Sequence, residues 1–348
     1  MSGRMASLFG RVRGLLRRGL LLAVRAADLA LLGFQVWYRL PRRARMAILA
    51  IALVLLAFAP VVLPAYRATF ILLTFMYVTL ASSWNIVSGY TGYVSFGHAA
   101  FFGLGAYTAA LLILRLGIHW LLASLAGGLL AAAVALPLGF VLLRLRGPYF
   151  AIAMLGLAAA FEVVALSWVQ LTRGGAGLSL PPTLNLLQVY YAMGLAMVIV
   201  VALSYAIVTS KYGLRLIAIR EDEDAADALG INTTFHKVSA FTLSAFFPGV
   251  VGGLYAWHLA YIDPNAVFRP LLSIGMVIMT MFGGIGTVTG PIIGGVLLSA
   301  LAEVFWARLP ELHRGAYGAL IVLVVLLMPG GVVALAKRRG FLPPNWRG

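Results

Sequence analysis

Five carboxylates lie close together in a chain that has few of them elsewhere. Glu221, Asp222, Glu223, Asp224 and Asp227 fall within seven positions and make up half of the ten acidic residues in 348. Clustered carboxylates of this kind can form ion pairs with basic groups on a partner protein. They can equally belong to a charged loop that only faces water.

The other side chains that could do chemistry are scattered. Glu162 and Glu303 lie within apolar stretches, where an ionisable group points to a functional role. We expect Glu162 to meet a substrate ammonium or a neighbouring arginine, and Glu303 to lie at an interface. The chain has no cysteine, no His-x-x-x-His pair and no G-x-x-x-x-G-K-[ST] motif. The sequence therefore predicts no catalytic residue, metal site or cofactor, and no ATP hydrolysis by this chain.

The stretch SGYTGYVSFGHAA, from Ser88, is unusually polar and rich in glycine for an apolar region. A break of this kind is tolerated inside a membrane only where protein or a water-filled cavity covers the backbone, and an exposed helix N-terminus there could face a substrate carboxylate. Alternatively, the glycines only allow tight packing and the histidine is a satisfied core group. The candidate substrate-pathway residues are Gly89, Tyr90, Thr91, Gly92, Ser95, Phe96, Gly97, His98 and Glu162.

The composition indicates a membrane protein. Hydrophobic residues make up 62% of the chain and charged residues 10%, against about 45–50% and about 25% in soluble domains. The apolar runs are continuous rather than alternating, so an all-α polytopic protein is expected rather than a barrel. The net charge of +16 is concentrated before residue 46, with ten arginines there. We attribute it to topology and lipid contact, and expect no binding of nucleic acid.

The apolar runs predict about ten transmembrane helices. Two of the predicted spans are short and are joined by the turn GGIGTVTG, which indicates broken or tilted helices. The ten spans are 46–63, 69–88, 96–116, 119–143, 148–171, 186–209, 237–262, 271–284, 290–307 and 316–335.

Three regions follow from this pattern: a basic extension over residues 1–45, a transmembrane domain over 46–336 and a basic tail over 337–348. Residues 20–40 are apolar, but Arg25 and Asp28 lie well inside them. We favour a helix lying in the membrane interface over an eleventh span, because charges at a helix centre cost about 2.5–3.5 kcal/mol each on the insertion scale.

Basic residues give the orientation. With the N-terminus inside, ten crossings place twenty Lys and Arg residues inside and six outside, as the positive-inside rule requires. Both termini are then cytoplasmic. The longest inside loop is 211–236, and the Gly/Pro-rich loop 172–185 lies outside.

The acidic cluster is expected to form a short cytoplasmic helix from Asp222 to Leu229. Acids favour a helix N-terminus, and Gly230 can supply the left-handed residue that ends it. Ala225 and Leu229 share a face at i, i+4, with Ala226 beside them. A small apolar face ringed by charge suits docking onto another protein.

Four stretches resemble one family. GLRLIAIREDEDAADALGIN, SGYTGYVSFGHAAFFGLGAYTAALL, LRLRGPYFAIAMLGLA and FGGIGTVTGPIIGG are similar, in order and spacing, to segments of the permeases of branched-chain amino-acid ABC transporters. The resemblance covers roughly residues 70–335 and is greatest for the longer, M-type subunit. Urea and amide permeases share the same features.

The resemblance implies a subunit of a bacterial inner-membrane importer. Its partners would be a second permease subunit, most simply in a heterodimer, two cytoplasmic ATPase subunits, a periplasmic substrate-binding protein and membrane lipid. The loop 211–236 would contact an ATPase. The ATPase-coupling residues would be Arg220, Glu221, Asp222, Glu223, Ala225, Ala226, Leu229 and Gly230.

Other functions stay open at this point. A urea or short-amide permease would share the motifs. An ion-coupled secondary transporter would show more titratable residues within its spans and an internal repeat. A membrane enzyme would need a convergent set of reactive groups.

Overall fold

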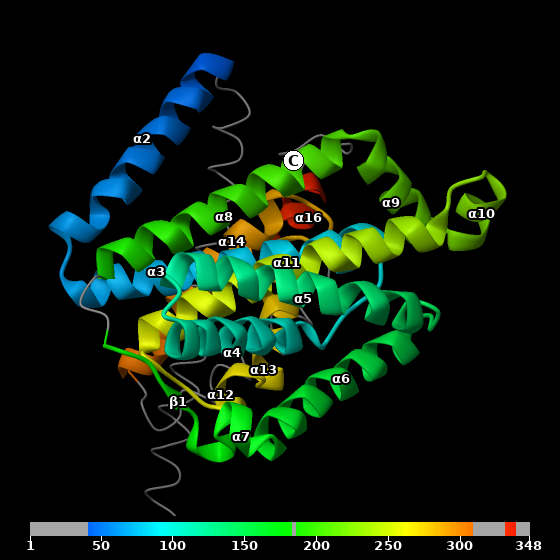
Figure 1. Cartoon of the computed structure of the whole chain (residues 1–348). Helices are drawn as coiled ribbons and strands as arrows, with labels where there is room; N and C mark the ends of the chain where they lie inside the picture. Colours follow the sequence, from blue (N-terminus) through cyan, green and yellow to red (C-terminus); the bar gives the residue numbers. More distant parts are fainter. Residues whose placement is uncertain (1–40, 183–185, 309–330, 339–348) are drawn as a thin grey trace, which may run out of the picture.

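The computed structural model describes residues 41–182, 186–308 and 331–338, and in that part of the chain the fold is almost entirely helical (Figure 1). Among these residues, seven helical segments are long and apolar enough to cross a membrane. The longer helices are α2 (Arg42–Val62), α3 (Ala65–Trp84), α4 (His98–Leu116), α5 (Trp120–Leu142), α6 (Pro148–Ser167), α8 (Leu186–Thr209), α9 (Lys211–Glu221), α11 (Thr233–Leu259), α13 (Pro270–Gly283) and α14 (Thr289–Arg308). The short elements are the π-helix η1 (Asn85–Gly89), α7 (Val169–Thr172), the 3₁₀-helix η2 (Gly174–Ala176), β1 (Leu178–Ser179), α10 (Glu223–Ala228), β2 (Tyr261–Ile262), α12 (Pro264–Val267) and α16 (Gly331–Arg338).

The all-α membrane fold agrees with the prediction, but the count of about ten spans is not confirmed. Six of the seven spans are α3 continued through η1, α4, α5, α6, α8 and α11. The seventh is α12 with α13, Pro264–Gly283, which extends the predicted short span 271–284 towards the N-terminus. The predicted first span corresponds to α2, which is not among the seven, and Thr289–Glu303 is a shorter apolar helix. The predicted helix at 20–40 and most of the predicted span 316–335 lie outside the described residues.

Local sequence explains where several helices begin. Pro148 opens α6 and Pro270 opens α13, and proline suits the first helical position because its missing N–H has no partner there. The Ser210 hydroxyl accepts from the Gly213 N–H at 3.2 Å at the start of α9. The Ser210 cap thus begins α9, the first helix within the predicted loop 211–236.

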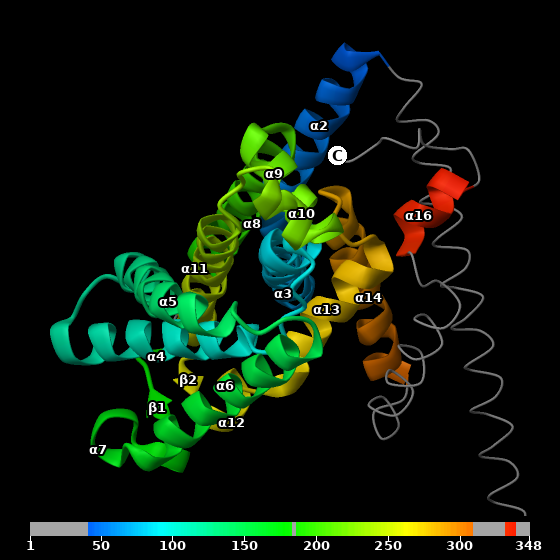
Figure 2. The ribbon, with the colours of Figure 1, turned by 90° about the vertical axis from the view of Figure 1, so that its right-hand side faces the viewer.

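Two helices form the centre of the bundle. In the most apolar 18-residue windows, 78% of α3 with η1 and 72% of α11 are buried, against 28% of α5 and 22% of α6. Viewed along the bundle, α3 lies between α11 and α8 on one side and α13 and α14 on the other (Figure 2). The exposed apolar surfaces of α2, α5, α6 and α8 are therefore available to lipid.

Glycines bring α4, α5 and α11 into backbone contact. A methyl group added at Gly105 would overlap the backbone of Gly249, and one at Gly252 would overlap the carbonyl of Phe102. A methyl group at Gly127 of α5 would approach the Gly105 carbonyl oxygen to 2.7 Å. Small residues permit such close packing of membrane helices.

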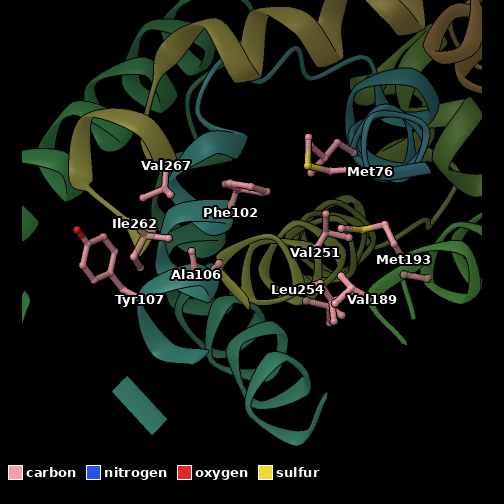
Figure 3. Close-up of a cluster of buried hydrophobic side chains, with 14 of the residues drawn as sticks. Met76, Phe102, Ala106, Tyr107, Val189, Met193, Val251, Leu254, Ile262 and Val267 are labelled. Carbon is pink, nitrogen blue, oxygen red and sulfur yellow. The ribbon is translucent and has the colours of Figure 1, made fainter. Parts of the chain in front are cut away.

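The largest hydrophobic cluster joins α3, α4, α8, α11 and α12. Met76, Phe102, Met193 and Leu254 are among its buried members, and their side chains converge in Figure 3. Phe268, just after α12, stacks on Tyr107 of α4 at 6.0 Å between ring centroids. This cluster packs the segments β2 and α12 against the helical bundle.

The connections between helices gather at two opposite ends. At one end, β1 pairs antiparallel with β2, Leu178 opposite Ile262. At the other end, α9 and α10 extend beyond α8 and α11 (right-hand side of Figure 1), and the connections 90–97, 143–147 and 284–288 lie among them. This grouping agrees with the predicted alternation of the loops between two sides of the bundle.

The glycine-rich sequence after α13 forms a tight turn. Gly283 lies against the backbone of Gly290, leaving no space for a methyl group. The Thr287 hydroxyl accepts from the Gly290 N–H at 3.0 Å and donates to the Gly284 carbonyl at 2.8 Å. The sequence GGIGTVTG therefore forms the tight turn of a helical hairpin between α13 and α14.

Candidate functional site

The acidic cluster forms the short helix α10, close to the predicted Asp222–Leu229. Asp222 is its N-cap, and the Asp222 carboxylate accepts from the Ala225 N–H at 2.9 Å. Glu223 and Asp224 occupy the first turn, where negative charge is stabilised by the helix dipole. Three of the five clustered acids thus help to start this helix.

The end of α10 is a Schellman motif. Gly230 has a φ of 82°, a left-handed conformation that is costly for residues with a side chain. The Gly230 N–H donates to the Asp227 carbonyl at 2.8 Å, and the Ile231 N–H donates to the Ala226 carbonyl at 3.1 Å. These two bonds are the ones that define the motif, so the predicted role of Gly230 as the helix stop is confirmed.

The small apolar residues of α10 divide between two faces. Ala226 is 2% exposed and packs into the protein, whereas Ala225 is exposed and Leu229 is 82% exposed. The predicted docking face therefore consists of Ala225 and Leu229 without Ala226. A leucine this exposed at the end of a capped helix is available to a partner.

A buried lysine anchors α10 to the membrane helices. Lys237 lies in the second turn of α11 with its side chain 6% exposed, and its Nζ donates to Glu223 Oε1 at 2.6 Å, to Tyr93 Oη at 3.1 Å and to the Leu143 carbonyl at 3.1 Å. Tyr93 Oη in turn donates to Glu223 Oε2 at 2.5 Å. We call these four residues, Tyr93, Leu143, Glu223 and Lys237, the Lys237 junction.

The groups around Glu223 favour the ionised form of its carboxylate. Partial burial by itself would raise the pKa of Glu223, but hydrogen bonds from Lys237 and Tyr93 and the charges of Lys237 and Arg146 lower it overall. Burial, and then the adjacent Glu223, raise the pKa of Tyr93, so its hydroxyl stays a donor. Removing one partner of a buried ion pair costs about 3–5 kcal/mol, so this junction holds α10 firmly.

A second ion pair attaches α10 at the surface. The Arg146 guanidinium, in the α5–α6 connection, donates to both oxygens of Asp224 at 2.8 and 3.1 Å, and it lowers the pKa of that carboxyl. The side chains of Arg146 and Asp224 are 62% and 78% exposed. Water screens an exposed pair, so it stabilises far less than a buried one.

Arg220 links α9 to the π-helix. Its Nη1 donates to the Gly89 carbonyl at 3.1 Å, and its Nη2 pairs with Glu221 at 2.7 Å. Asn85, at the other end of η1, accepts from the Gly286 N–H at 2.9 Å and donates to the Thr287 carbonyl at 2.9 Å. The candidate coupling residues and the glycine-rich stretch from Ser88 are therefore in direct contact, which their sequence positions did not indicate.

The predicted pathway stretch is a packed connection between η1 and α4. Gly89, Tyr90, Thr91, Ser95, Gly97 and His98 are buried, Phe96 is half-buried and Gly92 is exposed beside Arg220. A methyl group at Gly97 would overlap the carbonyl of Met154 on α6. The glycines thus allow backbone approach, and lining of a pathway by this stretch stays a prediction.

The His98 side chain is fully buried and has polar partners. Its Nδ1 lies 2.8 Å from Ser95 Oγ and its Nε2 lies 3.1 Å from Ser244 Oγ, and the rings of Phe101 and Phe241 pack edge-on to it. Both ring nitrogens therefore have protein partners in this conformation. The arrangement matches a satisfied core histidine more closely than a ligand.

The two intramembrane glutamates lie apart from this site. Glu162 is half-buried on α6, between the middle of that helix and its end at Ser167. Glu303 Oε1, on α14, is buried and has no hydrogen-bond partner in the described part of the chain. Within the described residues, no group of three His, Asp or Glu side chains could hold a metal ion.

Sequence reasoning missed the residues that attach α10. Lys237 and Arg146 counted only as inside charges, and Tyr93 carried no predicted role. One signal was available: Lys237 is one of only three lysines in the chain and is followed at once by an apolar helix. A lone ionisable group at such a place calls for a named partner.

Known proteins resemble most of the chain. The family described as "Branched-chain amino acid transport system / permease component" matches residues 66–325. The chain is 29% identical over 297 residues to the high-affinity branched-chain amino acid transport system permease protein LivM of Salmonella typhimurium, covering 76% of this chain and 69% of that protein. It is 28% identical over 296 residues to Escherichia coli LivM, with the same coverage, and 28% identical to Salmonella typhimurium LivH over 74% of this chain and 91% of that protein. No solved structure gives a significant match.

Proposed function

Since the chain belongs to the family of branched-chain amino acid transport system permease components, we propose that it forms one half of the membrane pathway of an ATP-driven importer. The relatives comprise two kinds of permease, LivM and LivH. The chain resembles LivM at slightly higher identity, and we assign it the M-type role beside an H-type sister subunit. The cargo is a branched-chain amino acid.

The observation that carries this proposal is the construction of α10. Its inner side is anchored through the contact of Glu223 with Lys237, and its outer side presents Ala225 and Leu229 to solvent. The first turn of this capped helix is held by buried contacts, and its C-terminal end exposes apolar side chains. Such a helix is suited to receive force from a partner. We assign that partner as an ATPase subunit in the cytoplasm.

The chain does no covalent chemistry in this scheme. Two ATPase subunits supply free energy and a periplasmic binding protein supplies affinity for the cargo. Nucleotide and loaded binding protein each stabilise one of two permease conformations, and import follows from switching between them. The membrane is the bacterial inner membrane, with α10 and both termini on the cytoplasmic side.

Reconstitution tests this function directly. The chain, its sister permease and the ATPase pair are purified together, placed in liposomes, and given a leucine-loaded binding protein. Uptake of labelled leucine is expected only with ATP and with all subunits. Uptake driven by an ion gradient without ATP, or full uptake by this chain alone, would refute the proposal and favour a secondary transporter.

Sidedness can be tested separately because the chain has no cysteine. A single cysteine at Asp227 in α10 is expected to react with an impermeant maleimide only after the cells are opened. Gly175, exposed in the loop before β1, is the matched control, and its cysteine variant is expected to react in intact cells. The reverse pattern would contradict the assigned orientation.

A further inference from the structure

We infer that Lys237 is a positioning residue that carries displacement of α10 into the connection 90–97 and the start of α11. This inference rests on the proposed function, in which α10 receives force from an ATPase. It adds the route by which that force enters the membrane helices.

The geometry of Lys237 supports a rigid joint. A lysine ammonium has three N–H donors and no acceptor. Here the three donors reach three separate segments: Glu223 of α10, Tyr93 of the 90–97 connection and the Leu143 carbonyl at the end of α5. With every donor engaged and the side chain 6% exposed, the ammonium cannot reorient without breaking a buried contact.

Tyr93 extends the joint to a fourth helix. Its ring packs edge-on to Phe150 of α6, with 5.4 Å between centroids, and Lys237 Nζ lies 4.7 Å from the centroid of the Tyr93 ring. Tyr93 also donates directly to Glu223. A shift of α10 must therefore move Tyr93 and Lys237 together, or separate a buried ion pair.

The other attachments of α10 are less suited to this task. The Arg146–Asp224 pair is largely exposed, so water screens the attraction between its charges. Arg220 contacts the Gly89 carbonyl from α9 and not from α10. The Lys237 junction is accordingly the buried polar route from α10 to the bundle among the described residues.

The experiment compares Lys237→Met and Glu223→Gln with Asp224→Asn in the reconstituted importer. Asp224 is the matched control because it is the next residue and its ion pair lies at the surface. We expect the junction variants to co-purify with the ATPase and to hydrolyse ATP. The number of leucine molecules taken up per ATP should fall roughly tenfold or more, which lies within the about 5- to 150-fold effects that typical coupling free energies produce. Asp224→Asn is expected to leave that ratio within about twofold.

A second measurement separates transmission from simple folding. Because the chain has no native cysteine, pairs of cysteines can be introduced and spin-labelled. One pair reports the distance between positions 227 and 175, and the other reports the distance between positions 94 and 175. In the wild type, ATP is expected to change both distances. In Lys237→Met, the first distance is expected to change and the second is not.

Each outcome decides the inference. It is overturned if Lys237→Met and Glu223→Gln keep the wild-type ratio, if Asp224→Asn lowers the ratio equally, or if both spin-label distances still change in Lys237→Met. If the single variants fail to assemble, Tyr93→Phe, which removes one hydroxyl, is used instead. A wild-type ratio of leucine to ATP in that variant would overturn the inference, and a reduced ratio would support it. A wild-type importer that does not couple uptake to ATP would refute the proposed function instead.

Discussion

Replacing Leu229 with asparagine tests whether the tip of α10 docks onto an ATPase. In the isolated chain the Leu229 side chain is 82% exposed, so the substitution removes few contacts within the chain itself. In the assembled importer we expect Leu229 to be covered. The variant should therefore fold normally and bind its partner more weakly.

The expected size follows from the exposed area. Fully burying a leucine side chain stabilises by about 1.5–3 kcal/mol, and 82% of that range is about 1.2–2.5 kcal/mol. At about 1.4 kcal/mol for each tenfold change, the dissociation constant for the ATPase should rise about 7- to 60-fold.

The assay is a titration of detergent-solubilised permease pair with the purified ATPase subunit. Leu116→Asn is the matched control, because Leu116 is 68% exposed at the opposite end of the bundle, and its binding should stay as in the wild type. An equal effect of both substitutions, or less than about a threefold effect at Leu229, would refute the docking role of α10.

Further predictions concern the pH response, the end of α10, the glycine packing and the intramembrane acids. The pKa of Glu223 is lowered from its usual 4.5. Its ion pair therefore stabilises the protein above that pH, and this stabilisation is lost as the pH falls below it. The difference in Tm between wild type and Glu223→Gln should be constant from pH 7 to about 5 and should shrink at lower pH. Gly230→Val should cost at least roughly 1–2 kcal/mol at φ 82°, seen as faster amide exchange in α10 and reduced uptake per ATP; unchanged exchange would contradict the motif. Gly252→Ala should lower stability by about 1–3 kcal/mol through overpacking, measured by thermal unfolding in detergent. Glu162→Gln should change uptake more than Glu303→Gln, and the opposite ranking would contradict the predicted pathway.

The sequence was most informative where structure is local. Apolar length predicted α4, α5 and α8 within a few residues, and the acids with Gly230 predicted α10 together with its stop. Each of these elements depends on neighbours in the chain, such as caps, turn glycines and continuous apolar runs. The predicted number of spans is not confirmed, because α2 is not among the seven, Thr289–Glu303 is a shorter apolar helix and most of the predicted span 316–335 lies outside the described residues.

The attachments of α10 could not be predicted, because they join residues far apart in the chain. Tyr93 and Glu223 are 130 positions apart, and Arg146 and Asp224 are 78 apart. Nothing in the local pattern indicates that the connection after η1 meets the acidic helix. The β1–β2 pairing, only two residues long on each strand, was missed for the same reason.

The backbone contact among α4, α5 and α11 has a mechanical consequence. With little side chain between them at Gly105, Gly127 and Gly249, these helices have little freedom to slide past one another by changing rotamers, and we expect them to move together. The 27-residue α11 is about 40 Å long, and a tilt of about 5° at one end carries the other end about 3.5 Å. In the proposed importer, a tilt of α11 about its start near Lys237 would be largest at the other end of the helix, where α11 runs into β2.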